Sequence, residues 1–332
     1  MNGRPSIPAD ALVTVVVPAY NAEDTIDETL RSVRAQTHRN LEIIVVDDGS
    51  RDGTADIAAR HAADDNRLRV VRQDNAGVAA ARNTGWRMGG GDVFSFVDAD
   101  DLWSPEKTAE QLAVMRAKPD VDLVYSWYVI IDGDSRITLQ WPGEEWEGDV
   151  LSRLLVSNFI GNGSSVMVTR QALESAGGFE PGLRGAGAQG CEDILFYCRV
   201  AEHHRFALAP GYFIGYRYID GNMSSDLPRM LRSWLLVLDE METRHPDKRA
   251  EMATGFDRFS RWLVRRAVQL GQPRYLPGLF AIMARRAPVQ AVRIMASEVP
   301  KAISDFHHPL KNRSDPASAA DMRGPRFAIA EP

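Results

Sequence analysis

The apolar run LVTVVVP, residues 12–18, has the composition of a strand that is buried on both faces of a sheet. A helical pattern follows it in residues 24–36. The same strand-then-helix scheme recurs, with strands predicted in LEIIVVDDGS (41–50), LRVVRQ (68–73) and DVFSFVDAD (92–100). Repeated βα units predict an α/β fold in which the strands are parallel and the crossovers right-handed.

Polar residues stand at the carboxyl end of each predicted strand, in 18–21, 47–50, 74–77 and 98–101. In open α/β sheets these ends meet at one edge, and ligands bind there. We therefore expect a crevice of nucleotide size that is lined by carboxylates.

The stretch FSFVDADDLW, residues 94–103, places three aspartates within four positions directly after a strand. Crowding like charges is costly unless a cation lies among them. Two interpretations are open from the residues alone. The carboxylates hold a metal ion, or they form a solvated turn that caps the next helix.

The second half of the chain has a different pattern. Residues 122–131 and 137–141 alternate like antiparallel strands, and the glycine-rich stretch 184–190 leads into a helix that begins near CEDILFYCR (191–199). From residue 228 to about 306 the pattern is helical throughout, and after about 312 Ser, Asp, Pro and Ala dominate.

Charge is unevenly distributed along the 332 residues. Residues 1–228 carry 21 Lys and Arg against 34 Asp and Glu, a net charge of −13, whereas residues 229–313 carry 16 against 8, a net charge of +8. The basic part lacks a recognised nucleic-acid module, so we expect no nucleic-acid partner. It is compatible with an anionic membrane surface, and equally with a solvated face on a packing or dimerising bundle.

The chain shows no apolar leader and no run long enough for a membrane helix, and we expect a cytoplasmic location, with contact at the inner membrane face as an option. Cys191 and Cys198 lie two turns apart on one predicted helix, a spacing that disfavours a disulfide.

Five motifs in order resemble family 2 glycosyltransferases, which are inverting, use nucleotide sugars and have the GT-A fold. The motifs are VVVPAYNAE (15–23), VVDDGSRDGT (45–54), NAGVAAARNTG (75–85), FVDADD (96–101) and CEDILFYCR (191–199). The resemblance implies a GT-A sheet with helices on both faces, a mixed-sheet acceptor half and a helical appendage. The implied division is an extension (1–11), a nucleotide-sugar half (12–118), an acceptor half (119–227), a helical region (228–308) and an unstructured tail (309–332).

By resemblance, Asp98, Ala99 and Asp100 form the metal-binding motif of the family. Asp100 would ligate Mn²⁺ or Mg²⁺ directly, and Asp98 would contact the ribose or a metal-bound water. A divalent ion held by one or two carboxylates and by phosphate oxygens suits this role. We expect Asp101 to cap the following turn.

The nucleotide would lie against the other strand ends. Asp48 would accept a hydrogen bond from the ring N–H of uracil or thymine, with Asp47 beside it, and Arg82 would face the diphosphate. The further nucleotide contacts expected are Pro18, Ala19, Tyr20, Asn21, Glu23, Gly49, Asn75 and Gly77. Both acidic stretches are also compatible with simple βα turns, and Asn83 with a helix surface.

Glu192 and Asp193 match the acidic pair in which the family places its catalytic base. We expect Asp193 to take the proton of the acceptor hydroxyl, and a helix N-terminus to keep it ionised at pH 7. The alternative is that both acids only favour the helix start. Arg217 is expected to close over the donor, and Trp127, Gly163 and Ser164 to contact donor or acceptor.

These observations predict an enzyme that transfers one sugar from a UDP- or dTDP-sugar to a glycan or lipid-linked acceptor in polysaccharide or cell-envelope synthesis. Two alternatives remain: an inactive nucleotide- or glycan-binding relative, and a sugar-nucleotide nucleotidyltransferase. The second would want a Gly-rich basic loop after the first strand, and PAYNAEDT (18–25) lacks one. A dehydrogenase is excluded by the lack of G-x-G-x-x-G there. We keep a homodimer through the C-terminal helices as an option.

Overall fold

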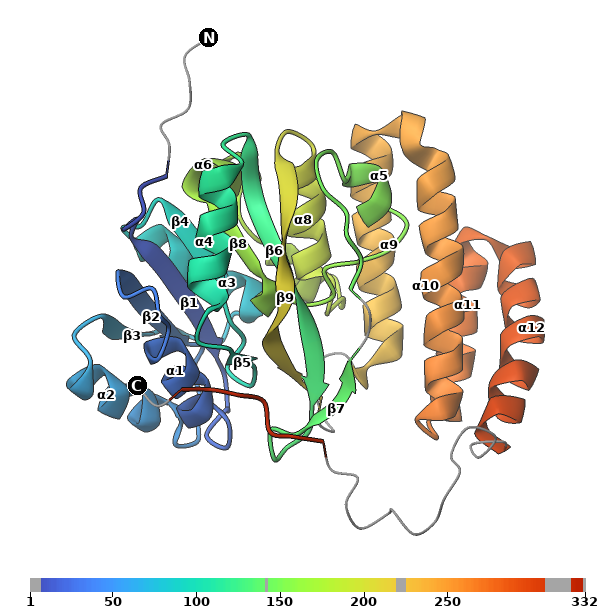
Figure 1. Ribbon diagram of the computed structural model, residues 1–332. Coiled ribbons are helices and arrows are strands. Elements are labelled where there is room, and N and C mark those ends of the chain that lie inside the picture. The colour runs from blue at the N-terminus through green and yellow to red at the C-terminus, as the bar shows by residue number, and fades with distance from the viewer. Residues whose placement is uncertain (1–6, 141–142, 219–224, 308–323, 331–332) are drawn as a thin grey trace.

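The computed structural model describes residues 7–140, 143–218, 225–307 and 324–330. A single nine-stranded mixed sheet runs through it in the order β3-β2-β1-β4-β8-β6-β9-β5, with β7 paired to β6 (Figure 1). The strands are β1 (Val13–Ala19), β2 (Leu41–Asp47), β3 (Leu68–Arg72), β4 (Val93–Phe96), β5 (Leu102–Trp103), β6 (Val121–Ile131), β7 (Ile137–Gln140), β8 (Val166–Thr169) and β9 (Arg205–Arg217).

The helices connect these strands and then continue beyond them. They are α1 (Ile26–Arg34), α2 (Thr54–Asp64), α3 (Val78–Met88), α4 (Lys107–Ala117), α5 (Leu151–Leu154), α6 (Arg170–Ser175), α7 (Gly182–Gly185), α8 (Glu192–Ala201), α9 (Leu227–Arg244), α10 (Arg249–Gln269), α11 (Leu276–Arg286) and α12 (Pro288–His307). Short 3₁₀ turns include η1 (Gly163–Ser165), just before β8.

The first half of the sheet has the predicted parallel arrangement. Strand β1 pairs in parallel with β2 and β4, and β2 with β3. The second half is mixed, because β8 is antiparallel to both β4 and β6 while β6 is parallel to β9. The predicted α/β class is therefore confirmed, and the carboxyl ends of β1, β2, β3 and β4 lie at one edge.

Alternating residues of β1 enter two different cores. Val13, Val15 and Val17 pack with α1 and α4 on one face of the sheet. Val16 packs on the other face, in a larger core with α3 and α8. Burial on both faces explains the uninterrupted apolar run that defines this strand.

Helices α9 to α12 extend the larger core rather than form one of their own. Leu227, Phe256, Met283 and Ile294 belong to the same buried cluster as the sheet residues. In Figure 1 these helices stand side by side beyond α8. No helix within the described residues is long and apolar enough to cross a membrane.

Several arginines of this region bind neighbouring helices. Arg261 pairs with Asp257 at 2.6 Å and with Glu298 of α12 at 2.7 Å. Arg286 pairs with Glu242 of α9 at 3.1 Å. Part of the positive charge of this region is therefore neutralised by ion pairs within the helical bundle. Contact with a membrane stays a prediction.

The expectation of an unstructured tail over 309–332 is wrong for residues 324–330. Phe327 is only 7% exposed and packs with Leu102, Val129 and Ile131, and Arg326 forms a β-bridge with Arg136. The prediction relied on the average composition of a polar stretch. Such an average does not detect one aromatic side chain, Phe327, that packs against the sheet. Residues 309–323 lie outside the described part of the chain.

Helix α3 lies directly against β1 at Gly85, where no space is left for a side chain. A Cβ atom on Gly85 would lie 2.3 Å from Cγ1 of Val16. Alanine normally stabilises a helix by about 1 kcal/mol relative to glycine, but overpacking a core costs about 1–3 kcal/mol. We expect Gly85→Ala to lower the free energy of unfolding in urea.

Gly278 of α11 is the matched control, because the nearest atom to its added Cβ is Cγ of Pro228 at an ordinary 3.6 Å. Gly278→Ala should raise the free energy of unfolding by a fraction of 1 kcal/mol. Equal stabilisation by both substitutions would contradict the close packing of α3 on β1.

Candidate active site

The loop that follows β4 carries the aspartate cluster and is anchored from several directions. The hydroxyl of Ser164 accepts a hydrogen bond from the Asp98 amide at 3.0 Å and donates one to Asp101 at 2.5 Å. The Ala99 carbonyl accepts hydrogen bonds from Thr25 at 2.9 Å and Thr29 at 3.0 Å of α1. The loop therefore has a fixed main-chain path.

Arg82 of α3 lies at the centre of the site and is 2% exposed. Its Nη2 donates to Asp98 at 2.6 Å, and its Nη1 lies 3.7 Å from Glu192. Desolvation alone would lower the pKa of Arg82, but Asp98, Glu192 and Asp193 together raise it. The guanidinium is therefore a permanent cation that joins the β4 loop to α8.

Two guanidinium nitrogens of Arg82 make no hydrogen bond to the described residues. Its Nε and Nη1 are buried without a hydrogen-bond partner among the described residues. Leaving such donors unpaired costs free energy, whereas an anionic oxygen would satisfy them. The arrangement therefore suits a phosphate group.

Asp193 lies in the first turn of α8, beside Glu192. Desolvation and the neighbouring charge of Glu192 raise the pKa of Asp193 to about 7, although Arg82 acts in the opposite direction. Burial and the neighbouring acid thus act against the ionised form that the helix N-terminus is expected to favour, and the ionisation of Asp193 at pH 7 stays a prediction. A carboxylate with a pKa near 7 is well matched to general-base work.

Asp98 and Asp100 have the properties of a cation site. Desolvation and the charge of Asp98 raise the pKa of Asp100 to about 6. A divalent ion between them would remove this repulsion. No group of three or more His, Cys, Asp or Glu in the described part of the chain is placed to hold a metal, so phosphate oxygens would have to complete the coordination.

Asp101 has a different environment from its neighbours and is fully buried. It accepts hydrogen bonds from Ser164 and from the Arg217 amide, the latter at 2.9 Å. Burial and the charges of Asp100 and Asp98 raise its pKa well above the usual range. Its contacts join the β4 loop to β9 and η1, which is more than the simple turn cap expected.

Asp47 and Asp48 end β2 and are both buried. Asp48 accepts hydrogen bonds from Gln73 and from the amides of Ala76 and Gly77, at 2.7, 2.8 and 2.7 Å. It therefore closes the 73–77 loop, and a role toward a base remains a prediction. Asp47 accepts from the Ser50 amide at 3.0 Å and lies 3.3 Å from Nε of Arg72.

The loops after β1 and β2 are joined to one another. Asn21, at a positive φ of 48°, accepts from the Arg51 amide at 2.9 Å, and Glu23 accepts from the Gly53 amide at 2.7 Å. The Ala19 carbonyl accepts from the Asp48 amide at 2.8 Å. Asn21 and Glu23 therefore have structural partners, and their contact with a nucleotide remains a prediction.

The remaining predicted nucleotide contacts lie around these loops. Pro18 is buried in β1, whereas Tyr20 is 49% exposed and Asn75 is also exposed. Gly49 and Gly77 have positive φ values of 77° and 92°, and an added Cβ on Gly77 would lie 2.9 Å from Cδ of Arg184. Arg184 of the 182–185 turn therefore approaches the 73–77 loop, which the sequence did not indicate.

Arg217 does not lie as predicted. Its side chain is 1% exposed, and its five N–H groups all have acceptors: Asp100, Asp132, Gly133, Glu28 and Ser135. No donor is left for a diphosphate, so the expectation that this side chain closes over the donor is wrong. Residues 219–224, shortly after Arg217, lie outside the described residues.

Gly163 and Ser164 belong to the site as backbone supports. A Cβ atom on Gly163 would lie 2.5 Å from Nη2 of Arg82, so the guanidinium needs a glycine there. Trp127 lies apart from the carboxylates, where its ring packs against Tyr212 at 5.3 Å. Its predicted contact with substrate remains untested.

Sequence reasoning missed several supports of the site. Asn83 is 4% exposed rather than on a helix surface, and it bonds both the amide and the carbonyl of Phe179, at 2.9 and 2.7 Å. Phe179 in turn lies 5.2 Å from the Arg82 guanidinium. No local sequence pattern predicts the role of Phe179, because it is about a hundred residues away from Arg82 and Asn83 in the sequence.

Residues 14–175 match the family described as Glycosyl transferase family 2. The putative teichuronic acid biosynthesis glycosyltransferase TuaG of Bacillus subtilis (strain 168) is 43% identical over 105 residues, 31% of this chain and 42% of that protein. The UDP-Glc:alpha-D-GlcNAc-diphosphoundecaprenol beta-1,3-glucosyltransferase WfgD of Escherichia coli is 36% identical over 127 residues, 38% of this chain and 49% of that protein. The matches thus cover less than half of either relative.

Solved structures share the fold over nearly the whole chain. S. aureus TarS 1–349 in complex with UDP-GlcNAc superposes with a TM-score of 0.64 at 19% identity, over 91% of this chain and 93% of that chain. The mannosyltransferase PcManGT from Pyrobaculum calidifontis, in complex with GDP-Man and Mn²⁺, gives 0.54 at 20% identity, over 93% and 91%. These likenesses confirm the predicted GT-A fold.

Residues 14–175, which include Asp48, Arg82 and the Asp98–Asp101 loop, therefore match the sequence pattern of glycosyl transferase family 2.

Proposed function

We propose that this protein is an inverting glycosyltransferase that moves one sugar from a UDP-type donor to a glycan or lipid-linked acceptor. The observation that carries the proposal is the meeting of Asp98, Arg82 and Asp193 at one edge of the sheet. A cation site, a buried arginine with unused donors and a carboxylate with a pKa near 7 are the three groups that such a transfer needs.

In the proposed reaction, Asp193 takes the proton from the acceptor hydroxyl. The acceptor oxygen forms a bond to the anomeric carbon while the bond from that carbon to the diphosphate oxygen breaks. A single displacement of this kind inverts the anomeric configuration. The diphosphate leaves with the bonding electrons, and the positive charge of Arg82 would stabilise the negative charge that develops on it.

A divalent ion, Mn²⁺ or Mg²⁺, would be held by Asp98 and Asp100 and would act as a Lewis acid on the diphosphate. The buried side of the loop, at Asp101, is already occupied by Ser164 and Arg217. This leaves Asp98 and Asp100, which are both partly exposed, to face the donor.

Our proposal for the donor and the acceptor is based on the names of related proteins. The TarS neighbour was solved with UDP-GlcNAc, and WfgD is named for UDP-Glc and a diphosphoundecaprenol acceptor. We accordingly propose a uridine nucleotide and an acceptor of the cell envelope. PcManGT, with GDP-Man and Mn²⁺, makes GDP-sugars the first alternative to test.

The central test is nucleotide release from a panel of UDP-, dTDP- and GDP-sugars, with Mn²⁺, Mg²⁺ or EDTA. We expect slow, metal-dependent hydrolysis of one donor, and its stimulation by a matched acceptor only when Asp193 is present. Asp193→Asn should lower stimulated turnover by about 10²–10⁴-fold, because it removes the base. Asp64→Asn, on the exposed surface of α2, is the control and should leave turnover unchanged.

If neither turnover nor metal-dependent UDP binding by calorimetry is found for the wild type, the transferase proposal fails. Binding without turnover on any donor would favour the inactive relative instead. A pyrophosphate product from a sugar phosphate and a nucleoside triphosphate would favour the nucleotidyltransferase.

The raised pKa of Asp193 predicts a pH dependence. The base works only when ionised, and its pKa of about 7 lies above the ordinary range of aspartate. Initial rates at low substrate should therefore rise about tenfold per pH unit below pH 7 and level off above it. A rate that stays flat from about pH 5 to 8 would show that a group of ordinary aspartate pKa is the base.

Gly163 gives a test of Arg82 that keeps the arginine in place. Gly163→Ala would bring a methyl group within 2.5 Å of Nη2 and displace the guanidinium from Asp98. We expect kcat/KM to fall by about tenfold or more, in line with the loss of one charged contact to the transition state. Gly185→Ala, with no atom within 4 Å of its added Cβ, should leave kcat/KM unchanged.

A further inference from the structure

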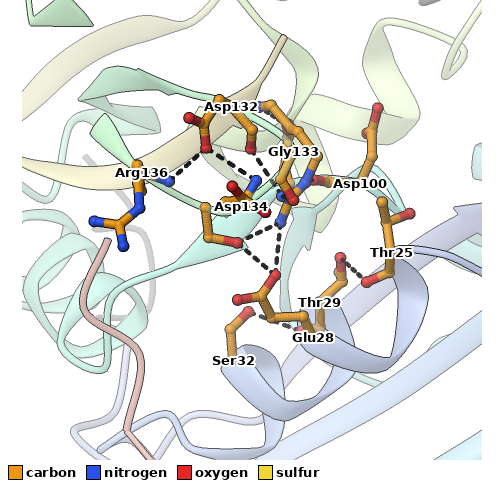
Figure 2. Close-up of polar contacts among 12 residues, drawn as sticks. Thr25, Glu28, Thr29, Ser32, Asp100, Asp132, Gly133, Asp134 and Arg136 are labelled. Atoms are coloured by element: carbon orange, nitrogen blue, oxygen red, sulfur yellow. Dashed lines mark hydrogen bonds and ion pairs between the residues drawn. The ribbon is translucent and has the colours of Figure 1, made fainter. Parts of the chain in front are cut away.

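A buried network centred on Arg217 contacts the β4 loop. The N–H groups of its guanidinium donate to the Asp100 carbonyl at 2.7 Å, to the carbonyls of Asp132 and Gly133 at 3.0 and 3.1 Å, and to Glu28 at 2.8 Å. Figure 2 shows Glu28 of α1 facing the 132–134 turn, with Asp100 beside it. This arginine thus fixes the main chain of the proposed metal-binding residue.

Ser135 is the fifth acceptor for this guanidinium and has an unusual backbone conformation. Its Oγ accepts from Nη2 of Arg217 at 3.0 Å and donates to Glu28 at 2.6 Å. Its φ of 62° is unusual for a residue with a side chain. Such a conformation persists only where the surroundings hold it.

The C-terminal segment, residues 324–330, helps to stabilise the turn that contains Ser135. The Phe327 amide donates to the Ser135 carbonyl at 2.8 Å, and the Ile137 amide donates to the Pro325 carbonyl at 2.9 Å. Arg136 donates to the Gly324 carbonyl at 3.3 Å. The segment therefore binds the turn that presents Ser135 to Arg217.

Phe327 anchors the segment by its side chain. The ring is packed against Gly215 of β9, where an added Cβ would lie 3.0 Å from it, and it shares a small cluster with Leu102 and Ile131. Gly215 is two residues before Arg217, and Leu102 follows Asp101 directly. One aromatic ring thus contacts β5, which directly follows the aspartate loop, and β9, which carries Arg217.

We propose that residues 324–330 are a positioning element for donor binding, which holds the Asp98–Asp101 loop in order through Ser135 and Arg217. The inference rests on the proposed function, because it assigns that loop to the metal and the diphosphate. Asp98 and Asp100 repel one another in the free protein, so an unsupported loop would tend to open. Holding it in the bound conformation lowers the cost of binding a metal–nucleotide complex.

The first measurement needs no ligand. The amide of Asp98 donates to Ser164, that of Asp101 to Asp98, and that of Arg217 to Asp101. Hydrogen–deuterium exchange measures how strongly these amides are protected from solvent. In full-length Phe327→Ala we expect exchange of peptides over 96–103 and 214–218 to accelerate by about tenfold. Peptides of β2 should keep the wild-type rate.

The second measurement is calorimetric binding of UDP with Mn²⁺, followed by initial rates on the donor found above. Phe327→Ala should raise Kd and KM by about fivefold while kcat changes less than twofold, because the reacting groups are intact. Phe327→Tyr should restore both values. Arg326→Ala is the control, because that side chain is exposed and only its main chain forms the bridge.

Ser135→Gly separates positioning from folding. Glycine accepts a positive φ without strain, so this variant loses the hydroxyl but not the turn. We expect Kd for UDP with Mn²⁺ to rise in Ser135→Gly with little change in Tm. In the double variant with Phe327→Ala the two effects on Kd should be less than additive, because both act through one contact.

Unchanged exchange over 96–103 in Phe327→Ala would overturn the proposal, as would full additivity of the two substitutions or a fall in Tm without any change in Kd. If the wild type binds no UDP with Mn²⁺, the proposed function fails instead. The exchange measurement still decides in that case whether the segment orders the loop.

Discussion

The attraction between the buried Arg82 cation and the carboxylates around it is the constraint on which the site depends. Asp98, Glu192 and Asp193 come from a loop and a helix that are far apart in sequence, and like charges would drive them apart. Arg82 bonds Asp98 at 2.6 Å and lies 3.7 Å from Glu192. Taking a charged group out of water is costly unless it is paired, so the cation and the acids require one another.

The packing around Arg82 follows from this requirement. Gly163 leaves room for the guanidinium, and Phe179 covers it at 5.2 Å. Gly85, on the next turn of the same helix, lets α3 lie directly on β1. The side chain of Arg82 is therefore deeply buried, and two of its nitrogens, Nε and Nη1, make no hydrogen bond to the described residues.

The sequence was sufficient for the architecture and for the groups that converge at the sheet edge. Apolar runs and polar strand ends are local patterns, so β1, β2 and the Asp98–Asp101 loop could be predicted from them. The pKa of Asp193 could not, because it depends on how deeply α8 is buried. The docking of Phe327 could not either, since it depends on one contact with strands more than a hundred residues away.

Arg82 and Arg217 show why the orientation of a side chain was the hardest feature to predict. Both arginines lie near motifs of the family, both are at least 98% buried, and both contact the same four-residue loop. All five N–H groups of Arg217 donate to protein acceptors, four of which are main-chain or neutral oxygens. In Arg82, by contrast, Nε and Nη1 make no hydrogen bond to the described residues. The contacts of Arg217 hold the loop, whereas binding of an anion by Arg82 stays a prediction. The two arginines differ in how many of their hydrogen bonds the protein itself supplies, and this difference could not be read from the sequence.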